Sequence, residues 1–125
     1  MAIQTTVQKN NLATSYATNA THGALFTAAP PGGSSQAAAN EVTATGSPAY
    51  ARQPFTSGGA WSAASAGATS ATVTFDVPAS TTVTHAGVCS SGTQGAATVL
   101  DYNAVTPQAF SSQGTYQVTY IYTES

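Results

Sequence analysis

The stretch Ala71-Thr-Val-Thr-Phe-Asp-Val77 decides the fold class, because apolar and polar residues alternate along it. Val73, Phe75 and Val77 occupy every second position, and Pro78 ends the run. A period of two places the apolar side chains on one face of an extended chain. The stretch therefore predicts a half-buried β-strand.

Similar patterns predict further strands on both sides of this one. The strongest lies near the C-terminus, where one apolar face holds Tyr116, Val118, Tyr120 and Tyr122. Others are expected over 24–27, 81–89 and 97–102, with Gly, Pro and Ser between them. Short strands that recur with such breaks are typical of antiparallel sandwiches. We therefore expect a mainly β protein with the architecture of an antiparallel β-sandwich.

One short helix and one long loop complete the predicted domain. Residues 9–20 place Leu12 and Tyr16 one helical turn apart, with alanines on the same face. Residues 28–40 are rich in Ala, Pro, Gly and Ser, which predicts a surface loop. A length of 125 residues corresponds to one domain, so we interpret 1–125 as a single β-sandwich.

Charged residues are scarce in this chain, and this scarcity excludes several classes of partner. Two Lys and Arg against four Asp and Glu give a net charge of −2, and 5% of residues are charged. Binding to nucleic acid needs clustered cations, and a membrane-surface helix needs a basic face. No apolar stretch is long enough to span a bilayer, and no signal peptide is visible. A near-neutral surface repels itself weakly, which favours a subunit of an assembly.

Sequence patterns of catalytic or metal chemistry are missing. His85 and Cys89 are four residues apart, but on a strand this spacing covers about 13 Å, too far for one metal. As the only cysteine, Cys89 is expected to be a small buried apolar residue. Neither a nucleophile elbow nor a phosphate-binding glycine loop occurs. We expect no catalytic residue, no metal and no cofactor, and thus no enzyme.

Arg52 is the residue that the sequence singles out. It lies in a run that Pro54 restricts to an edge strand or an extended segment, and Glu41 precedes it. A bidentate ion pair between Arg52 and Glu41 is one interpretation. The other places Arg52 in solvent, with its stem across Tyr50. Trp61, the large side chain in a Gly, Ala and Ser stretch, is a candidate contact residue for carbohydrate, and Tyr50 is a second candidate contact.

Two blocks of sequence resemble a family of small structural proteins of tailed bacteriophages. The first is Asn40-Glu-Val-Thr43 followed by Tyr50-Ala-Arg-Gln-Pro-Phe55, similar to the family wording N-E-V-x-G and Y-A-R-Q. The second runs from Val73 to Val88 and contains Val83-Thr-His-Ala-Gly87, similar to V-T-H-x-G. The chain departs from the family by an insertion over 44–49, where members have a tight Gly-Gly turn.

This resemblance implies a β-sandwich without enzymatic activity that resides in the virion and is made in the host cytoplasm. Members are labelled minor capsid, minor tail or tail-fibre proteins, so both locations stay open. The first expectation is a capsid decoration protein that contacts the major capsid protein. The alternative is a minor tail or fibre-tip protein that binds host-surface carbohydrate and contacts other tail proteins. A homo-oligomer is expected in either case. The resemblance also favours a structural ion pair between Glu41 and Arg52, and it places His85 beside the strand over 73–77.

Overall fold

The computed structural model describes residues 6–30, 40–55, 62–64, 67–69 and 72–123. The chain begins with the helix α1 (Thr6–Asn19) and continues in strands. In chain order the strands are β1 (His22–Phe26), β2 (Gln53–Pro54), β3 (Ser62–Ala64), β4 (Gly67–Thr69), β5 (Val73–Val77), β6 (Thr81–Cys89), β7 (Val99–Phe110), β8 (Gly114–Val118) and β9 (Ile121–Thr123). The strand pairings are antiparallel, so the predicted mainly β class is confirmed.

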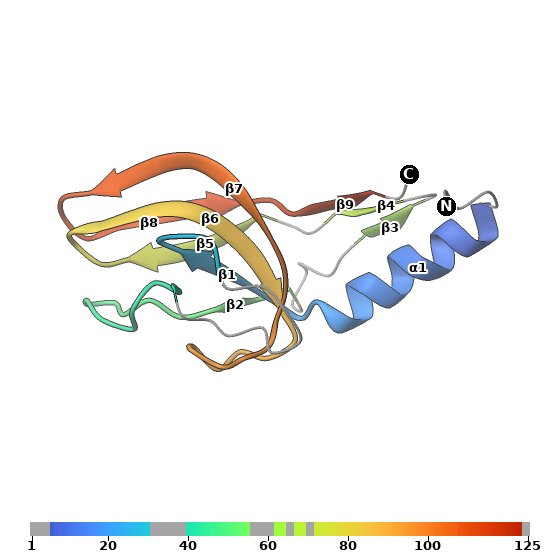
Figure 1. Cartoon of the computed structure of the whole chain (residues 1–125), viewed down its shortest axis with the longest axis horizontal. Helices are drawn as coiled ribbons and strands as arrows, with labels where there is room; N and C mark the ends of the chain where they lie inside the picture. The colour runs from blue at the N-terminus through green and yellow to red at the C-terminus, as the bar shows by residue number, and fades with distance from the viewer. Residues whose placement is uncertain (1–5, 31–39, 56–61, 65–66, 70–71, 124–125) are drawn as a thin grey trace.

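Two antiparallel sheets pack against each other to form the sandwich (Figure 1). One sheet has the order β2-β1-β6-β7, and the other pairs β5 with β8. The core between them takes Leu25 from β1, Val83 and Val88 from β6, and the alternating apolar residues of β5. Phe75, at the middle of β5, is 0% exposed. The alternation of apolar and polar residues over 71–77 predicts a strand with one buried face, and β5 is such a strand.

The third sheet lies outside the sandwich, beside the helix. It has the order β3-β4-β9, and α1 runs along β3 and β4 (Figure 1). Together these elements project away from the sandwich (Figure 1). The predicted helix over 9–20 is present, but it begins at Thr6 and ends at Asn19.

Two strand predictions differ from the structure at their ends. The strand expected over 97–102 extends to Phe110 as β7, which is the edge strand of its sheet. Its second half is largely exposed and contains Pro107, which an edge strand tolerates, so no buried face marks it in the sequence. The single strand expected to reach Tyr122 is divided into β8 and β9, which pair in different sheets.

The expected loop over 28–40 lies mostly outside the described residues, but its two ends are joined. The backbone N–H of Thr27 donates to the carbonyl oxygen of Asn40 at 2.8 Å, and the Asn40 amide donates to the carbonyl of Ala29 at 2.9 Å. The chain thus leaves β1 and returns to its edge at Asn40. This return brings Glu41, the next residue, beside the sandwich.

Candidate functional site

The first motif block lies along the edge of β1 that β6 leaves free. Residues 40–42 run antiparallel to the end of β1, where Glu41 bridges Phe26 and the Val42 N–H donates to the Leu25 carbonyl at 3.0 Å. β2 pairs with the start of the same strand. Glu41 and Arg52 therefore come from two segments that the same sheet edge positions.

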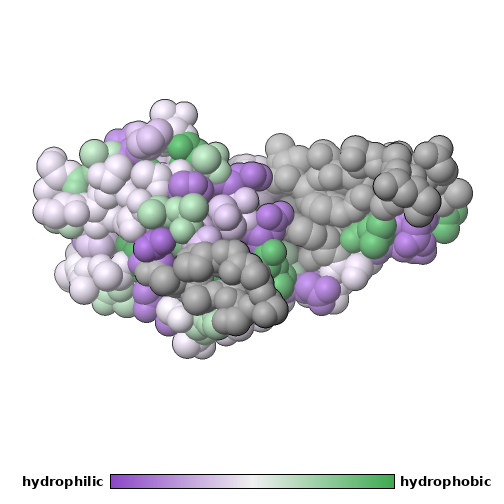
Figure 2. Space-filling view, in the orientation of Figure 1, coloured by the Kyte–Doolittle hydropathy of each residue, from purple (hydrophilic) through white to green (hydrophobic). Residues whose placement is uncertain are grey.

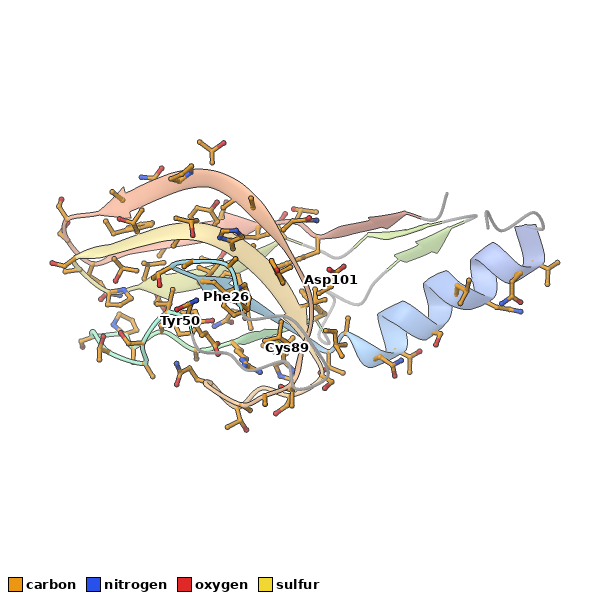
Figure 3. The ribbon with its side chains drawn as sticks, in the orientation of Figure 1. Phe26, Tyr50, Cys89 and Asp101 are labelled. Atoms are coloured by element: carbon orange, nitrogen blue, oxygen red, sulfur yellow. The ribbon has the colours of Figure 1, made fainter. Side chains whose placement is uncertain are left out.

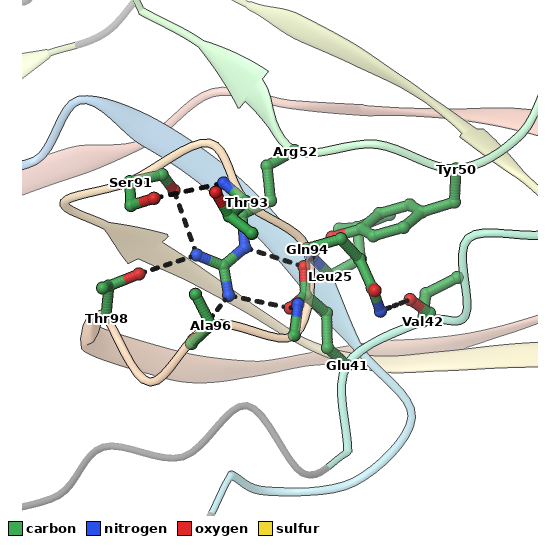
Figure 4. A network of polar contacts seen from close by, with 11 residues as sticks. Leu25, Glu41, Val42, Tyr50, Arg52, Ser91, Thr93, Gln94, Ala96 and Thr98 are labelled. Atoms are coloured by element: carbon green, nitrogen blue, oxygen red, sulfur yellow. Dashed lines mark hydrogen bonds and ion pairs between the residues drawn. The ribbon is translucent and has the colours of Figure 1, made fainter.

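Glu41 and Arg52 form a bidentate ion pair (Figure 4). Nη2 of Arg52 lies 2.8 Å from Oε1 of Glu41, and Nε lies 2.9 Å from Oε2. Both side chains are 0% exposed. Charge-assisted, parallel hydrogen bonds of this kind fix both distance and orientation. The structure thus brings together the two residues that the sequence paired, and it places Arg52 away from solvent.

The other donors of Arg52 reach the loop between β6 and β7, residues 90–98, which we call the β6–β7 loop. Nη1 donates to the carbonyl of Ser91 at 3.0 Å and to the hydroxyl of Thr98 at 2.8 Å. Nη2 also donates to the carbonyl of Ala96 at 3.0 Å. A guanidinium has five N–H donors, so these three bonds and the two to Glu41 use all of them.

The carboxylate of Glu41 is equally well satisfied. Oε2 also accepts a hydrogen bond from the Tyr50 hydroxyl at 2.8 Å, and Oε1 accepts one from the backbone N–H of Gly95 at 2.8 Å. Gly95 has a φ of 80°, a left-handed conformation that favours glycine. Among the described residues, no buried side-chain nitrogen or oxygen lacks a partner. The pair is therefore a closed network with no donor or acceptor left for a ligand.

Tyr50 completes the network from the core side. Its hydroxyl accepts a hydrogen bond from the Leu25 N–H at 3.0 Å, and its ring stacks on Phe75 with centroids 6.2 Å apart. Burial, and then the nearby charge of Glu41, raise the pKa of Tyr50 above its usual range. Tyr50 is 1% exposed, so its prediction as a contact residue is wrong. Its polar tip serves an internal hydrogen bond, which the sequence did not distinguish from a surface role.

The pKa values of Cys89 and His22, which lie near this network, are also shifted. Burial raises the pKa of the Cys89 thiol to about 12, although the positive Arg52 acts against this shift. Burial, and then the charge of Arg52, lower the pKa of His22. Cys89 and Phe26, labelled with Tyr50 in Figure 3, are buried in a second apolar cluster with Ala24 and Val99, separate from the core cluster that holds Tyr50. A thiol with a pKa this high is a poor nucleophile at neutral pH.

The remaining sequence candidates do not join this network. His85 lies on β6 and packs against Tyr102 of β7 with ring centroids 5.9 Å apart, so its expected place beside β5 is corrected. Trp61 lies outside the described residues. No group of His, Cys, Asp and Glu in the described part of the chain could hold a metal ion. The sequence missed the role of the β6–β7 loop, whose only signal is Gly95.

Comparisons with protein-family models, with curated proteins and with solved structures find no match to this chain. Within the described ranges, no helix has the length and apolar character needed to cross a membrane. The fold and the Glu41–Arg52 network therefore carry the functional argument.

Proposed function

We propose that this chain is a structural protein of a bacteriophage virion, specifically a capsid decoration or minor capsid protein that stabilises the outer shell. One observation carries the proposal. Glu41 and Arg52 belong to the motif that resembles phage structural proteins. Their side chains form hydrogen bonds with each other and with the β6–β7 loop. A motif used in this way supports a structural role rather than a catalytic one.

The low charge of the surface supports a place in a crowded assembly. The solvent face of β5 and β8 carries Thr and Gln side chains together with one charged residue, Asp76. The Gln117 amide donates to the Thr74 hydroxyl at 3.4 Å, and just beyond the strands the hydroxyls of Thr72 and Thr119 lie 2.6 Å apart. On the face seen in Figure 2, hydrophilic and weakly hydrophobic residues are mixed over the described part of the sandwich. Neighbouring copies with such surfaces repel one another weakly. This favours a homo-oligomer in contact with the major capsid protein.

The proposed location is the virion, after synthesis in the host cytoplasm, with neither a nucleic-acid partner nor a membrane. The net charge of −2 supports this choice of partners, because phosphate contacts need clustered cations. In this proposed role the protein has no catalytic activity and no cofactor. Its contribution is mechanical, since it adds contacts between subunits of the shell.

A minor tail or tail-fibre-tip protein is the second candidate. The observation that favours it is the elongated outline, in which α1 and the β3-β4-β9 sheet project from the sandwich (Figure 1). A role in binding host carbohydrate would need an exposed aromatic platform. Tyr50 is buried and does not supply it, so Trp61 is the residue to test.

Fractionation of phage particles separates the two candidates. Heads and tails are detached and purified from the phage that encodes the chain, and each fraction is probed for the protein. The decoration role predicts the protein on heads, and heads that lack it should rupture at a lower temperature. Recovery with tails only would contradict the decoration role and support the tail candidate.

A further inference from the structure

His22, the first residue of β1, packs against the β6–β7 loop as well as within the sheet. Its register partners are Cys89 on β6 and Pro54 on β2. A Cβ added at Gly92 would lie 2.7 Å from Nε2 of His22, so the tip of the half-buried ring lies directly against the loop backbone. The ion-pair network does not include this ring, although both contact the same loop.

The groups around the two ring nitrogens suit a neutral imidazole. Nδ1 lies 2.9 Å from the hydroxyl oxygen of Thr21, and this hydroxyl also donates to the Cys89 carbonyl at 3.5 Å. Nε2 faces Gly92, which offers no side-chain acceptor. A neutral imidazole has one donor nitrogen and one acceptor nitrogen, whereas a protonated ring donates from both. The position against Gly92 therefore favours the neutral ring.

The charge of Arg52 acts on His22 in the same direction. Nη1 of Arg52 donates to the carbonyl of Ser91, so the guanidinium and the His22 ring contact adjacent residues of the loop. A proton on His22 would add a second positive charge there, while the carboxylate of Glu41 is already paired with Arg52. Two like charges held close together disfavour the charged form of the weaker base, which here is the imidazole.

Among the described residues, the other groups that face His22 carry no charge. Cys89 stays a protonated thiol at neutral and acidic pH, because burial raises its pKa to about 12. The strand β2 contributes a glutamine and a proline, and residues 90–98 of the loop contain no titratable side chain. Burial of the ring, and then the charge of Arg52, lower the pKa of His22. Both effects depend on the loop being in place.

Opening of the loop would remove both effects. The ring would gain contact with water, and the pKa of His22 would return towards 6.5. The open form then binds the proton more tightly than the closed form, so a fall in pH below 6.5 favours opening. One proton changes the ratio of open to closed forms by at most about tenfold for each pH unit.

We propose that His22 makes the β6–β7 loop sensitive to pH, so that the loop stays attached to the ion pair at neutral pH and detaches more often once the ring is protonated. Detachment exposes the backbone groups that Arg52 and Glu41 otherwise bind. The change is local, because opening one loop needs less free energy than unfolding the domain. It is a property of the protein alone and does not depend on the proposed function.

Amide hydrogen exchange of the wild-type protein, followed by NMR between pH 7.5 and 5.0, tests the proposal. The Gly95 N–H reports on the loop, because it donates to Oε1 of Glu41. The Thr27 N–H donates to the Asn40 carbonyl beyond the other end of β1 and reports on opening elsewhere. After correction for the intrinsic pH dependence of exchange, we expect protection of Gly95 to fall severalfold, with a smaller fall or none at Thr27. Equal falls at both sites, or a constant protection at Gly95, would overturn the proposal.

Two neutral variants assign the effect to one ring. His22→Gln removes the titrating group, so its Gly95 protection should stay nearly constant over the same pH range. His85→Gln is the matched control, since His85 is the other histidine of the chain and lies on β6 against Tyr102. It should behave as the wild type does. A fall that persists in His22→Gln, or that is lost in His85→Gln, would show that another group controls the loop and would overturn the proposal, whatever the role of the protein in a virion.

Discussion

Replacement of Glu41 by glutamine removes one charge and keeps the size of the side chain. All four hydrogen bonds to the carboxylate come from donors, namely Arg52 through two nitrogens, the Tyr50 hydroxyl and the Gly95 N–H. Glutamine presents one oxygen and one NH₂ group. Whichever way the amide is turned, its NH₂ group faces two of these donors. Arg52, whose side chain is 0% exposed, is then left with an uncompensated charge.

The size of the effect follows from this loss. Breaking a buried ion pair on one side costs about 3–5 kcal/mol, because the remaining charge stays desolvated. The free energy of unfolding of a domain is about 5–15 kcal/mol, so Glu41→Gln removes a large part of it. We expect the melting temperature to fall by roughly 10 °C or more.

Urea unfolding followed by circular dichroism measures the change. Asp101→Asn is the control, since Asp101 is an exposed carboxylate whose Oδ1 accepts the Tyr102 N–H, and asparagine keeps that acceptor. It should change the free energy of unfolding by less than about 0.5 kcal/mol. Arg52→Met and the double variant complete a cycle. A coupling energy near zero, or equal effects of Glu41→Gln and Asp101→Asn, would refute the reasoning.

Three further predictions follow from the packing and the pKa shifts. Val118→Asp places a carboxylate against the core and should cost several kcal/mol, whereas Thr119→Asp on the exposed face should cost far less; equal urea midpoints would contradict the sandwich. Burial, and then the charge of Arg52, lower the pKa of His22 below 6.5 in the folded chain, so the unfolded chain binds this proton more readily. The free energy of unfolding therefore falls as the pH drops below 6.5. The urea midpoint should drop less between pH 7.5 and 5.5 in His22→Gln than in the wild type. Cys89, buried and with its pKa raised to about 12, should resist iodoacetamide at pH 7.5 until the chain unfolds; mass spectrometry detects the adduct, and rapid native labelling would contradict its burial.

The sequence predicts the fold best where one face of a strand is buried. Val73, Phe75 and Val77 alternate with polar residues because β5 faces the core on one side and water on the other. The outer half of β7 lacks this contrast, since an edge strand with little buried surface needs no alternation. The strands β3 and β4 are three residues long and rich in alanine, so neither length nor pattern identifies them.

The candidate site is predictable only in part for a related reason. Glu41 and Arg52 carry opposite charges, and a chain with few charges has few possible pairs. Their partners Ser91, Gly95 and Ala96 contribute backbone atoms, which every residue type possesses. Residue identity therefore gives no hint of these contacts. The buried place of Tyr50 depends on the same three-dimensional arrangement.

The copy number of this protein in the particle tests the central claim most directly. Quantitative mass spectrometry of purified virions compares it with the major capsid protein, using labelled peptides of both chains as standards. A decoration protein covers many equivalent sites, so we predict a copy number of the same order as that of the capsid subunit. A count of only a few copies per particle would contradict the account.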